Sequence, residues 1–427
     1  MTKIKPIIKK VLTEFNNESI KYCVLRNYEF LLDPNQPPGF DFDVSIAEED
    51  KQKVERIFAK NGFIKKPPQF SHKHQGYSYF SKEDLKKLGF DVQWNGVVWN
   101  DMYYLKNDIY SQRKKVGFLY TVSDEDAFIM YLCHSILGKR FFKEKYRQKL
   151  QELAKKELDF TAIAQRLNIL FKNKRAGKML IEQVKANKFD EIIKNRYHYI
   201  KRFILWNHLP LFIVLFFRWI NEKVIKRPQP LIAFIGPDGA GKSTTAERIK
   251  RILEDNDRKV AQAYLGRGKS HLLPINKTGR AVYEKIKNKK PGILIKILYT
   301  LAAPVYTTDL LLRYLFVVRP KRKRAIVITD RYCTDIYLMP RISNAMRSFL
   351  FHLFPKPTLT FYLYNTPEVL YERKHEQSVE ELRRQMDLFE KMSQKLQAFK
   401  VKTDNEEKVI AAIAKNIFEY LTRRGNE

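Results

Sequence analysis

A run of glycines with one lysine and one serine at fixed spacing is the clearest chemical signal in the chain. GPDGAGKS, residues 236–243, fits GxxxxGK[ST], with apolar residues 231–235 before it and a helix-forming stretch after it. Glycines let backbone N–H groups turn onto phosphate oxygens, and a helix N-terminus adds its dipole. We expect Lys242 to reach the β- and γ-phosphates of ATP and Ser243 to ligate Mg²⁺. The predicted nucleotide-binding residues are Gly236, Gly239, Ala240, Gly241, Lys242, Ser243 and Thr244.

Later stretches extend this signal into a family resemblance. The loop GPDGAGKST resembles that of the thymidylate kinase family, in which an acidic residue precedes Gly-x-Gly-Lys. AIVITDRY (325–332) resembles the family's strand ending in Asp-Arg-Tyr/Phe. Residues 357–374 and 375–392 resemble its next strand and helix and its basic lid, and 401–421 its last strand and helix. The resemblance covers about 229–422 and implies a P-loop kinase fold, an α/β parallel sheet flanked by helices.

The charges in these stretches suggest individual roles. Phosphoryl transfer needs positioned groups that neutralise developing negative charge. The resemblance implies that lid arginines close over the transferred group, although solvated helix charge is the alternative for them. It also implies that Asp330 joins Ser243 near the magnesium. The predicted catalytic residues are Lys242, Asp238, Asp330, Arg331, Arg373 and Arg383, and the predicted acceptor-binding residues are Arg267, Tyr332 and Arg384.

The chemical identity of the phosphate acceptor stays open at this point. A nucleoside monophosphate presents an anion and needs no general base, whereas a hydroxyl acceptor needs a carboxylate within reach. Asp238 and Asp330 are compatible with either kind of acceptor. Arg267 lies where the family holds its acceptor's phosphate, but the surrounding AYLGRGKS departs from the family's Arg-Glu-Pro-Gly run.

A second cluster of carboxylates lies near the N-terminus. GFDFDVSI places Asp41 and Asp43 on the same face of a strand, and Asp91 lies in a second apolar segment, LGFDVQW. Three such oxygen donors suit a magnesium site for nucleotidyl transfer. With LRNY (25–28) upstream and DVQW (91–94), this half resembles the nucleotidyltransferase superfamily, although the usual Gly-Ser pair is missing. A catalytically inactive domain of this fold and a surface Asp-x-Asp are the alternatives.

An apolar segment separates the two halves. FILWNHLPLFIVLFFRWI (203–220) is close to the length that crosses a bilayer, but it contains polar residues and is flanked by basic ones. Three interpretations remain: an interfacial helix on anionic lipid, a helix buried between domains, and a membrane span. The apolar run 293–318 could join the same surface.

Composition limits the classes of protein. Of 427 residues, 80 are Lys or Arg and 47 are Asp or Glu, so polyanionic partners or a merely soluble basic chain are expected. The three cysteines form no CxxC pair, and the start reads as a polar-faced helix and not a signal peptide. We predict a cytoplasmic protein, with the inner membrane face as a peripheral location. The predicted segments are 1–120 (nucleotidyltransferase-like), 121–200 (helical), 201–228 (linker) and 229–427 (kinase).

Four functions are compatible with the sequence. The first is an ATP- and Mg²⁺-dependent kinase of a nucleoside monophosphate. The second is a kinase of a membrane-associated or sugar hydroxyl. The third is a nucleic-acid end-processing or nucleotidyl-transferring protein, which the net charge of +33 and the three aspartates motivate. The fourth treats the N-terminal half as a binding module. Expected partners are a small-molecule phosphate acceptor and an anionic membrane, with nucleic acid and a homodimer left open.

Overall fold

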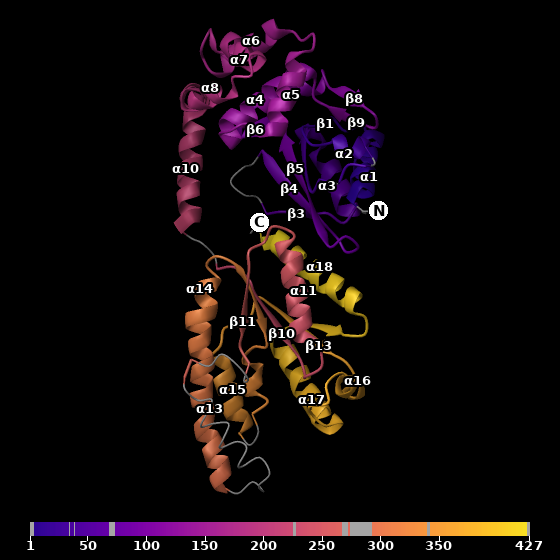
Figure 1. Ribbon diagram of the computed structural model, residues 1–427, viewed down its shortest axis with the longest axis vertical. Helices are drawn as coiled ribbons and strands as arrows, with labels where there is room; N and C mark the ends of the chain where they lie inside the picture. Colours follow the sequence, from indigo (N-terminus) through magenta and orange to yellow (C-terminus); the bar gives the residue numbers. More distant parts are fainter. Residues whose placement is uncertain are drawn as a thin grey trace. The chain divides into compact units, whose positions relative to one another are not determined.

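The computed structural model describes residues 4–33, 35–37, 39–67, 73–224, 228–266, 272–273, 293–339 and 342–424. It divides into two compact units, each with its own sheet and core (Figure 1). Unit 1 comprises Met1–Ile225 and Phe418–Glu427, and unit 2 comprises Lys226–Ile417.

Unit 1 is built on a mixed seven-stranded sheet in the order β3-β4-β5-β2-β1-β9-β8. Parallel pairing joins β2 to β5 and β1 to β9, and the other neighbours are antiparallel. A separate hairpin pairs β6 (Gly96–Trp99) with β7 (Met102–Lys106). The strands of the main sheet are β1 (Tyr22–Val24), β2 (Asp41–Ile46), β3 (Ile64–Lys65), β4 (His74–Ser81), β5 (Lys86–Trp94), β8 (Lys114–Val116) and β9 (Leu119–Thr121).

Two cores pack around this sheet. The first includes α1, whose apolar residues at helical spacing, such as Ile8, Leu12 and Phe15, are fully buried with α3 and the strands. The second joins the hairpin to the helices from α4 to η4. The helices are α1 (Ile4–Asn17), α2 (Glu29–Leu32), η1 (Glu48–Asp50), α3 (Lys51–Lys60), η2 (Asn107–Tyr110), α4 (Asp124–Cys133), η3 (His134–Lys139), α5 (Glu144–Ala154), α6 (Phe160–Leu170), α7 (Ala176–Lys185), α8 (Phe189–Lys194), α9 (Arg196–Phe203), η4 (Ile204–His208) and α10 (Leu209–Val224).

Unit 2 has an all-parallel five-stranded sheet in the order β11-β12-β10-β13-β14. The central strand β10 is buried along its whole length, as expected of a parallel sheet covered on both faces. The predicted P-loop kinase architecture of this half is confirmed, and the predicted α/β class of the N-terminal half is confirmed as well. The strands are β10 (Leu231–Ile235), β11 (Val260–Tyr264), β12 (Ile326–Asp330), β13 (Leu359–Tyr364) and β14 (Phe399–Lys402).

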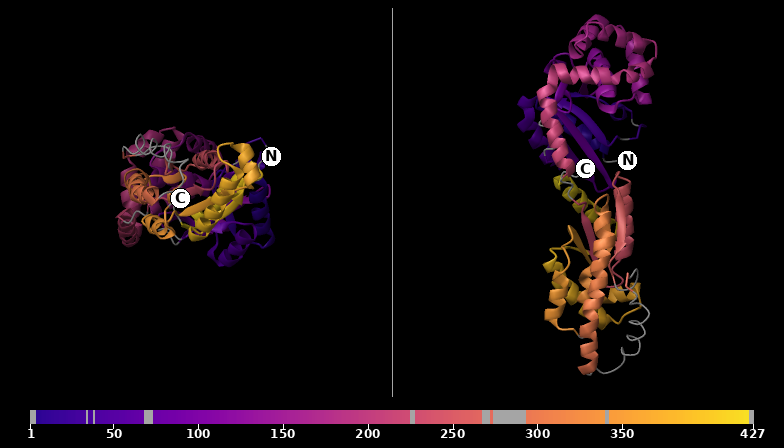
Figure 2. Two further views of the ribbon diagram at one scale, coloured as in Figure 1. Left: turned by 90° about the horizontal axis from the view of Figure 1, so that it is seen from below. Right: turned by 90° about the vertical axis from the view of Figure 1, so that its left-hand side faces the viewer.

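Helices cover both faces of this sheet. One core joins alternate residues of β10 to α13, η5, η6, α15 and α17, and Figures 1 and 2 show α13 running along the length of the unit. An ion pair of 2.8 Å between Arg248 and Glu406 joins α11 to α18. The helices are α11 (Lys242–Glu254), α13 (Ile293–Arg313), η5 (Tyr314–Val318), α14 (Arg319–Lys321), η6 (Cys333–Ile336), α15 (Asn344–His352), α16 (Pro367–Arg373), α17 (Val379–Lys395) and α18 (Glu406–Arg424), of which the residues up to Ile417 belong to unit 2.

The two apolar runs have different surroundings. By length and composition alone, the helical stretch Arg196–Phe217 could cross a membrane, and 11% of its apolar window is buried. Further along α10, Phe217 is 61% exposed and Trp219 45% exposed. By contrast, Leu310, Tyr314 and Val318 of the second run are buried in the core of unit 2. The described end of that run therefore packs against the sheet.

Candidate active site

The loop between β10 and α11 has the conformation that its glycines allow. Gly236, Gly239 and Gly241 have φ angles of 147°, 83° and 80°. A Cβ on Gly236 would lie 2.2 Å from the carbonyl oxygen of Leu363, and one on Gly239 would lie 2.6 Å from that of Leu370. At Gly236 and Gly239, both the backbone angle and the close approach of neighbouring backbone therefore require glycine.

Lys242 is the first residue of α11, and its side chain turns back over the loop. Its ammonium donates to the carbonyl oxygen of Pro237 at 2.7 Å and lies 3.7 Å from Asp238 Oδ1. Burial lowers the pKa of Lys242 to about 8, and the positive charge of Arg331 adds to the effect. An anion bound at this loop would favour the protonated ammonium.

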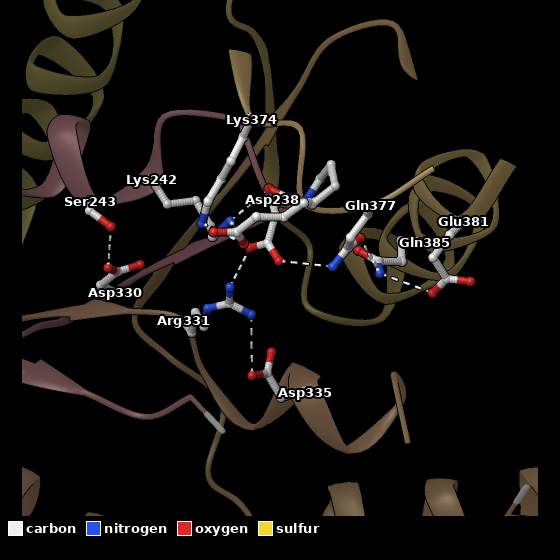
Figure 3. Close-up of polar contacts among 12 residues, drawn as sticks. Asp238, Lys242, Ser243, Asp330, Arg331, Asp335, Lys374, Gln377, Glu381 and Gln385 are labelled. Carbon is white, nitrogen blue, oxygen red and sulfur yellow. Dashed lines mark hydrogen bonds and ion pairs between the residues drawn. The ribbon is translucent and has the colours of Figure 1, made fainter. Parts of the chain in front are cut away.

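Ser243 and Asp330 face each other at the end of the central strands. The Ser243 hydroxyl donates to Asp330 Oδ2 at 2.5 Å (Figure 3). Asp330 ends β12, opposite Phe234 of β10. Its other oxygen, Oδ1, is buried and has no hydrogen-bond partner among the described residues. A hydroxyl beside a carboxylate with an unused buried oxygen fits Mg²⁺, which prefers oxygen ligands.

Arg331 connects the end of β12 to the phosphate loop. Its φ of 67° is unusual for a side chain this large, and its guanidinium donates to Asp238 and, at 3.4 Å, to Asp335 (Figure 3). Burial alone would raise the pKa of Asp238, but the charges of Arg331, Lys242 and Lys374 outweigh it and lower that pKa. Asp238 is therefore held as a carboxylate.

A polar chain continues from Asp238 to α17. Gln377 donates to Asp238 Oδ2 at 3.1 Å, and Gln385 donates to Gln377 Oε1 at 2.7 Å (Figure 3). The sequence did not indicate this contact, because a glutamine carries no charge pattern and lies 139 positions from its partner. Asp335 was missed too, although its position four residues after Arg331 in a short helical turn was a usable signal.

A buried ion pair supports the end of β11 from α13. Arg313 and Asp309, four residues apart, are 2% and 0% exposed and lie 2.9 Å apart. Arg313 also donates to the carbonyl oxygen of Gly266 at 3.1 Å, and a Cβ on Gly266 would lie 2.4 Å from Arg331 Cδ. The backbone after β11 is therefore packed directly against Arg331. This pair was hidden inside a run that reads as apolar.

The predicted lid arginines have other partners. Arg373 donates to the Thr403 carbonyl oxygen at 2.7 Å, Arg383 pairs with Glu368 at 3.3 Å, and Arg384 pairs with Glu381 at 2.7 Å. Arg383 and Arg384 have more than half of their side chains exposed. None of these contacts reaches the phosphate loop, so the roles of the three arginines over the transferred group stay predictions.

The remaining predicted residues of this half differ in placement. Ala240 is buried within the loop, while Thr244 is exposed in the first turn of α11. Tyr332 is 1% exposed and its hydroxyl donates to the carbonyl oxygen of Pro355, so its side chain packs in the core of unit 2. Arg267 lies outside the described residues.

The three N-terminal aspartates share one face of the unit 1 sheet. Asp43 and Asp91 are register partners on the parallel strands β2 and β5, with Asp41 two residues away. Desolvation and the charge of Asp91 raise the pKa of Asp41. Asp43, however, is paired with Arg26 at 2.9 Å. Within the described ranges no group of three His, Cys, Asp or Glu side chains is arranged to hold a metal, so the magnesium site here stays a prediction.

Comparison with known proteins agrees with the geometry of unit 2. Residues 234–420 match the family model described as thymidylate kinase, and this range includes the end of β10, the phosphate loop, Asp330, Arg331 and α17. The C-terminal half is thus a thymidylate kinase-like domain, which supports a nucleotide-kinase type of phosphoryl transfer. No curated protein matches the chain.

Proposed function

We propose that this protein transfers the γ-phosphoryl group of ATP to the phosphate of a nucleoside monophosphate. The observation that carries the proposal is the pairing of Asp238 with Arg331. A carboxylate whose pKa lies below its usual range is a weak general base, and Asp238 is already bound by a guanidinium. A hydroxyl acceptor needs such a base, whereas a phosphate acceptor does not. Asp330, the other candidate base, faces Ser243, where both would bind Mg²⁺. The site therefore favours an anionic acceptor.

The neighbouring residues suit the donor. The loop amides and Lys242 would hold the β- and γ-phosphates, and Ser243 with Asp330 would hold Mg²⁺ through oxygen atoms. The cation would supply neutralisation of the phosphate charges during transfer. Arg331 adds a fixed positive charge beside the loop, braced by Asp335 and by the packed Gly266 backbone.

Arg331 would also bind the phosphate of the acceptor. It lies between two carboxylates, Asp238 and Asp335, of which only Asp335 is fully buried. An incoming phosphate could share the guanidinium with Asp238 without stripping Arg331 of its buried partner. Arg331 would then orient the acceptor anion and lower the repulsion between the two phosphate groups.

The test measures ADP formation by the full chain with ATP and Mg²⁺. One arm adds dTMP, UMP, CMP or AMP, and a second arm adds the matching nucleosides, which offer hydroxyls and no phosphate. We expect at least one monophosphate to stimulate ADP formation strongly and its nucleoside to have no effect. Stimulation by nucleosides alone, or by no nucleotide at all, would overturn the proposal. Lys242→Met controls for a contaminating kinase.

A further inference from the structure

Unit 1 contains a cavity that the kinase reaction does not use. Its volume is about 1040 Å³, and its lining comes from the sheet, the β6–β7 hairpin, η3, α5 and α10, all within unit 1. Six Lys or Arg residues and four Asp residues are among the lining residues. The polar part of the cavity therefore has a positive excess, which suits an anionic ligand.

The positive charge is concentrated on one side. Lys139, Arg140, Lys143 and Lys145 are exposed at the rim, on η3 and the start of α5. Lys145 donates to Asn27 Oδ1 at 2.7 Å. Partial burial lowers the pKa of Lys145, and Lys143 and Arg26 lower it further. These cations repel one another, and a bound anion would relieve that repulsion.

The neighbouring carboxylates cancel only part of this charge. Arg26 is 8% exposed and bonds Asp43 through two nitrogens, at 2.9 and 3.2 Å, so that aspartate is already neutralised. His134 also lines the cavity. Burial, together with the surrounding cations, lowers the pKa of His134 to about 3, so its imidazole is neutral near pH 7. The candidate anion site thus consists of the basic side chains at the rim, with a neutral imidazole beside them.

The opposite wall is apolar and belongs to one helix. Phe212, Leu215, Phe216 and Trp219 of α10 line the cavity, at the spacing that places residues on one helix face. The adjoining surface of α10 is exposed, with Ile213, Val214 and Phe217 between 46% and 61% accessible. Apolar surface therefore continues from inside the cavity to the outside of the unit.

We propose that this cavity binds an amphiphile that carries a phosphate, with the phosphate on the basic rim and the hydrocarbon along α10. A small inorganic anion would leave the apolar wall uncovered. A metal-bound triphosphate is disfavoured because Arg26 occupies Asp43 and the described residues contain no three-ligand group. The proposal does not depend on the kinase reaction, which uses unit 2.

Tryptophan fluorescence tests this binding without using enzymatic activity. All four tryptophans are in unit 1, and two of them, Trp99 and Trp219, line the cavity. We expect dodecyl phosphate, titrated into the full chain below its micelle concentration, to change the emission in a saturable way. The double variant Trp99→Phe with Trp219→Phe should lose most of the change. Trp206→Phe, which alters a tryptophan outside the cavity, should keep it.

Matched variants test the contributions of the phosphate and of the hydrocarbon to binding separately. Lys143→Gln with Lys145→Gln should weaken dodecyl phosphate binding about tenfold, because charge-assisted contacts to phosphate are lost. Lys174→Gln with Lys178→Gln removes the same charge from exposed positions that do not line the cavity and should change nothing. Phe216→Ser should weaken binding, whereas its neighbour Phe217→Ser should not.

Sedimentation with lipid vesicles distinguishes a phosphate that belongs to a bilayer lipid from one that belongs to a soluble amphiphile. Sedimentation with phosphatidic acid vesicles, but not with phosphatidylcholine vesicles, would support a bilayer amphiphile. Dodecyl phosphate binding without vesicle binding would support a soluble one. The proposal is overturned if dodecanol binds as well as dodecyl phosphate, if inorganic phosphate binds as tightly, or if ATP with Mg²⁺ gives the same Trp99- and Trp219-dependent signal at lower concentration.

Discussion

Each unit pairs an arginine that follows a strand with an aspartate, but the two units build the surrounding sites differently. In unit 2, Arg331 pairs with Asp238 beside a glycine loop and a helix N-terminus, so backbone amides supply much of the positive field. In unit 1, Arg26 pairs with Asp43, and the positive field comes from long side chains on η3 and α5. Backbone amides are fixed in place, whereas lysine side chains adapt. The first arrangement suits a reaction, and the second suits binding.

Removal of the loop lysine should have the largest effect. Lys242→Met keeps the length of the side chain and removes the charge expected at the β- and γ-phosphates. We expect phosphoryl transfer to fall about a thousandfold, in line with the loss of a preorganised electrostatic contact. A coupled ADP assay measures it. The control is Lys250→Met on the same helix, which should keep near-normal turnover; an active Lys242→Met protein would contradict the comparison.

Glycine replacement in the loop should cost stability in a graded way. Gly236→Ala sets a Cβ 2.2 Å from a backbone oxygen, where no flexible side chain can give way. We expect a loss of about 3 kcal/mol or more in the free energy of unfolding of unit 2. At Gly241 no atom lies within 4 Å of an added Cβ, so Gly241→Ala should cost only about 1 kcal/mol from its positive φ. Urea unfolding compares the two, and equal losses would contradict this explanation.

In unit 1 replacement of the two strand aspartates should affect stability to different degrees. Asp43→Asn leaves the buried Arg26 without its ion-pair partner and should cost about 3 kcal/mol in the free energy of unfolding. Asp41→Asn removes a carboxylate whose pKa is already raised, so it should cost nothing. Neither variant should slow phosphoryl transfer under conditions where the chain is folded. If both variants abolish transfer, the chemistry is not confined to unit 2.

The smallest expected effect is a proton taken up with ATP. Because burial lowers the pKa of Lys242 to about 8, this lysine is mostly neutral at pH 9 before phosphate binds. Bound phosphate favours the charged form, so the pKa rises and more than about half a proton is taken up per ATP at pH 9. At pH 6.5 the lysine is already protonated and uptake should be near zero. Calorimetry in buffers of different ionisation enthalpy measures this difference, which should be absent in Lys242→Met.

Features formed by contiguous residues could be predicted from the sequence, whereas contacts between distant residues could not. The phosphate loop and the Asp330-Arg331 pair are contiguous stretches that follow apolar strands, and the parallel sheet brings the ends of β10 and β12 together. The sequence was sufficient to predict that these residues lie at the same end of the sheet, while their roles stay predictions. Asp238 meets Gln377 only because the chain returns to the loop before α17, and nothing in either stretch indicates that approach.

The two apolar runs also show what could not be predicted from the sequence alone. Residues 203–220 and 293–318 read alike in sequence, yet α10 is largely exposed while the described end of the second run lies in a core. The second run also contains Arg313 and Asp309, two opposite charges one helical turn apart that are buried together. In the sequence alone, the same two charged residues resemble the charged end of a membrane-associated segment.

Transfer of labelled phosphate tests the central claim most directly. The full chain is incubated with γ-³²P-labelled ATP, Mg²⁺ and the nucleoside monophosphate that best stimulates ADP formation, and the products are separated. We predict label in the nucleoside diphosphate for the wild-type protein and for Asp41→Asn, and about a thousandfold slower labelling for Lys242→Met. Label that appears in no nucleotide, or that forms in Lys242→Met at close to the wild-type rate, would contradict the account.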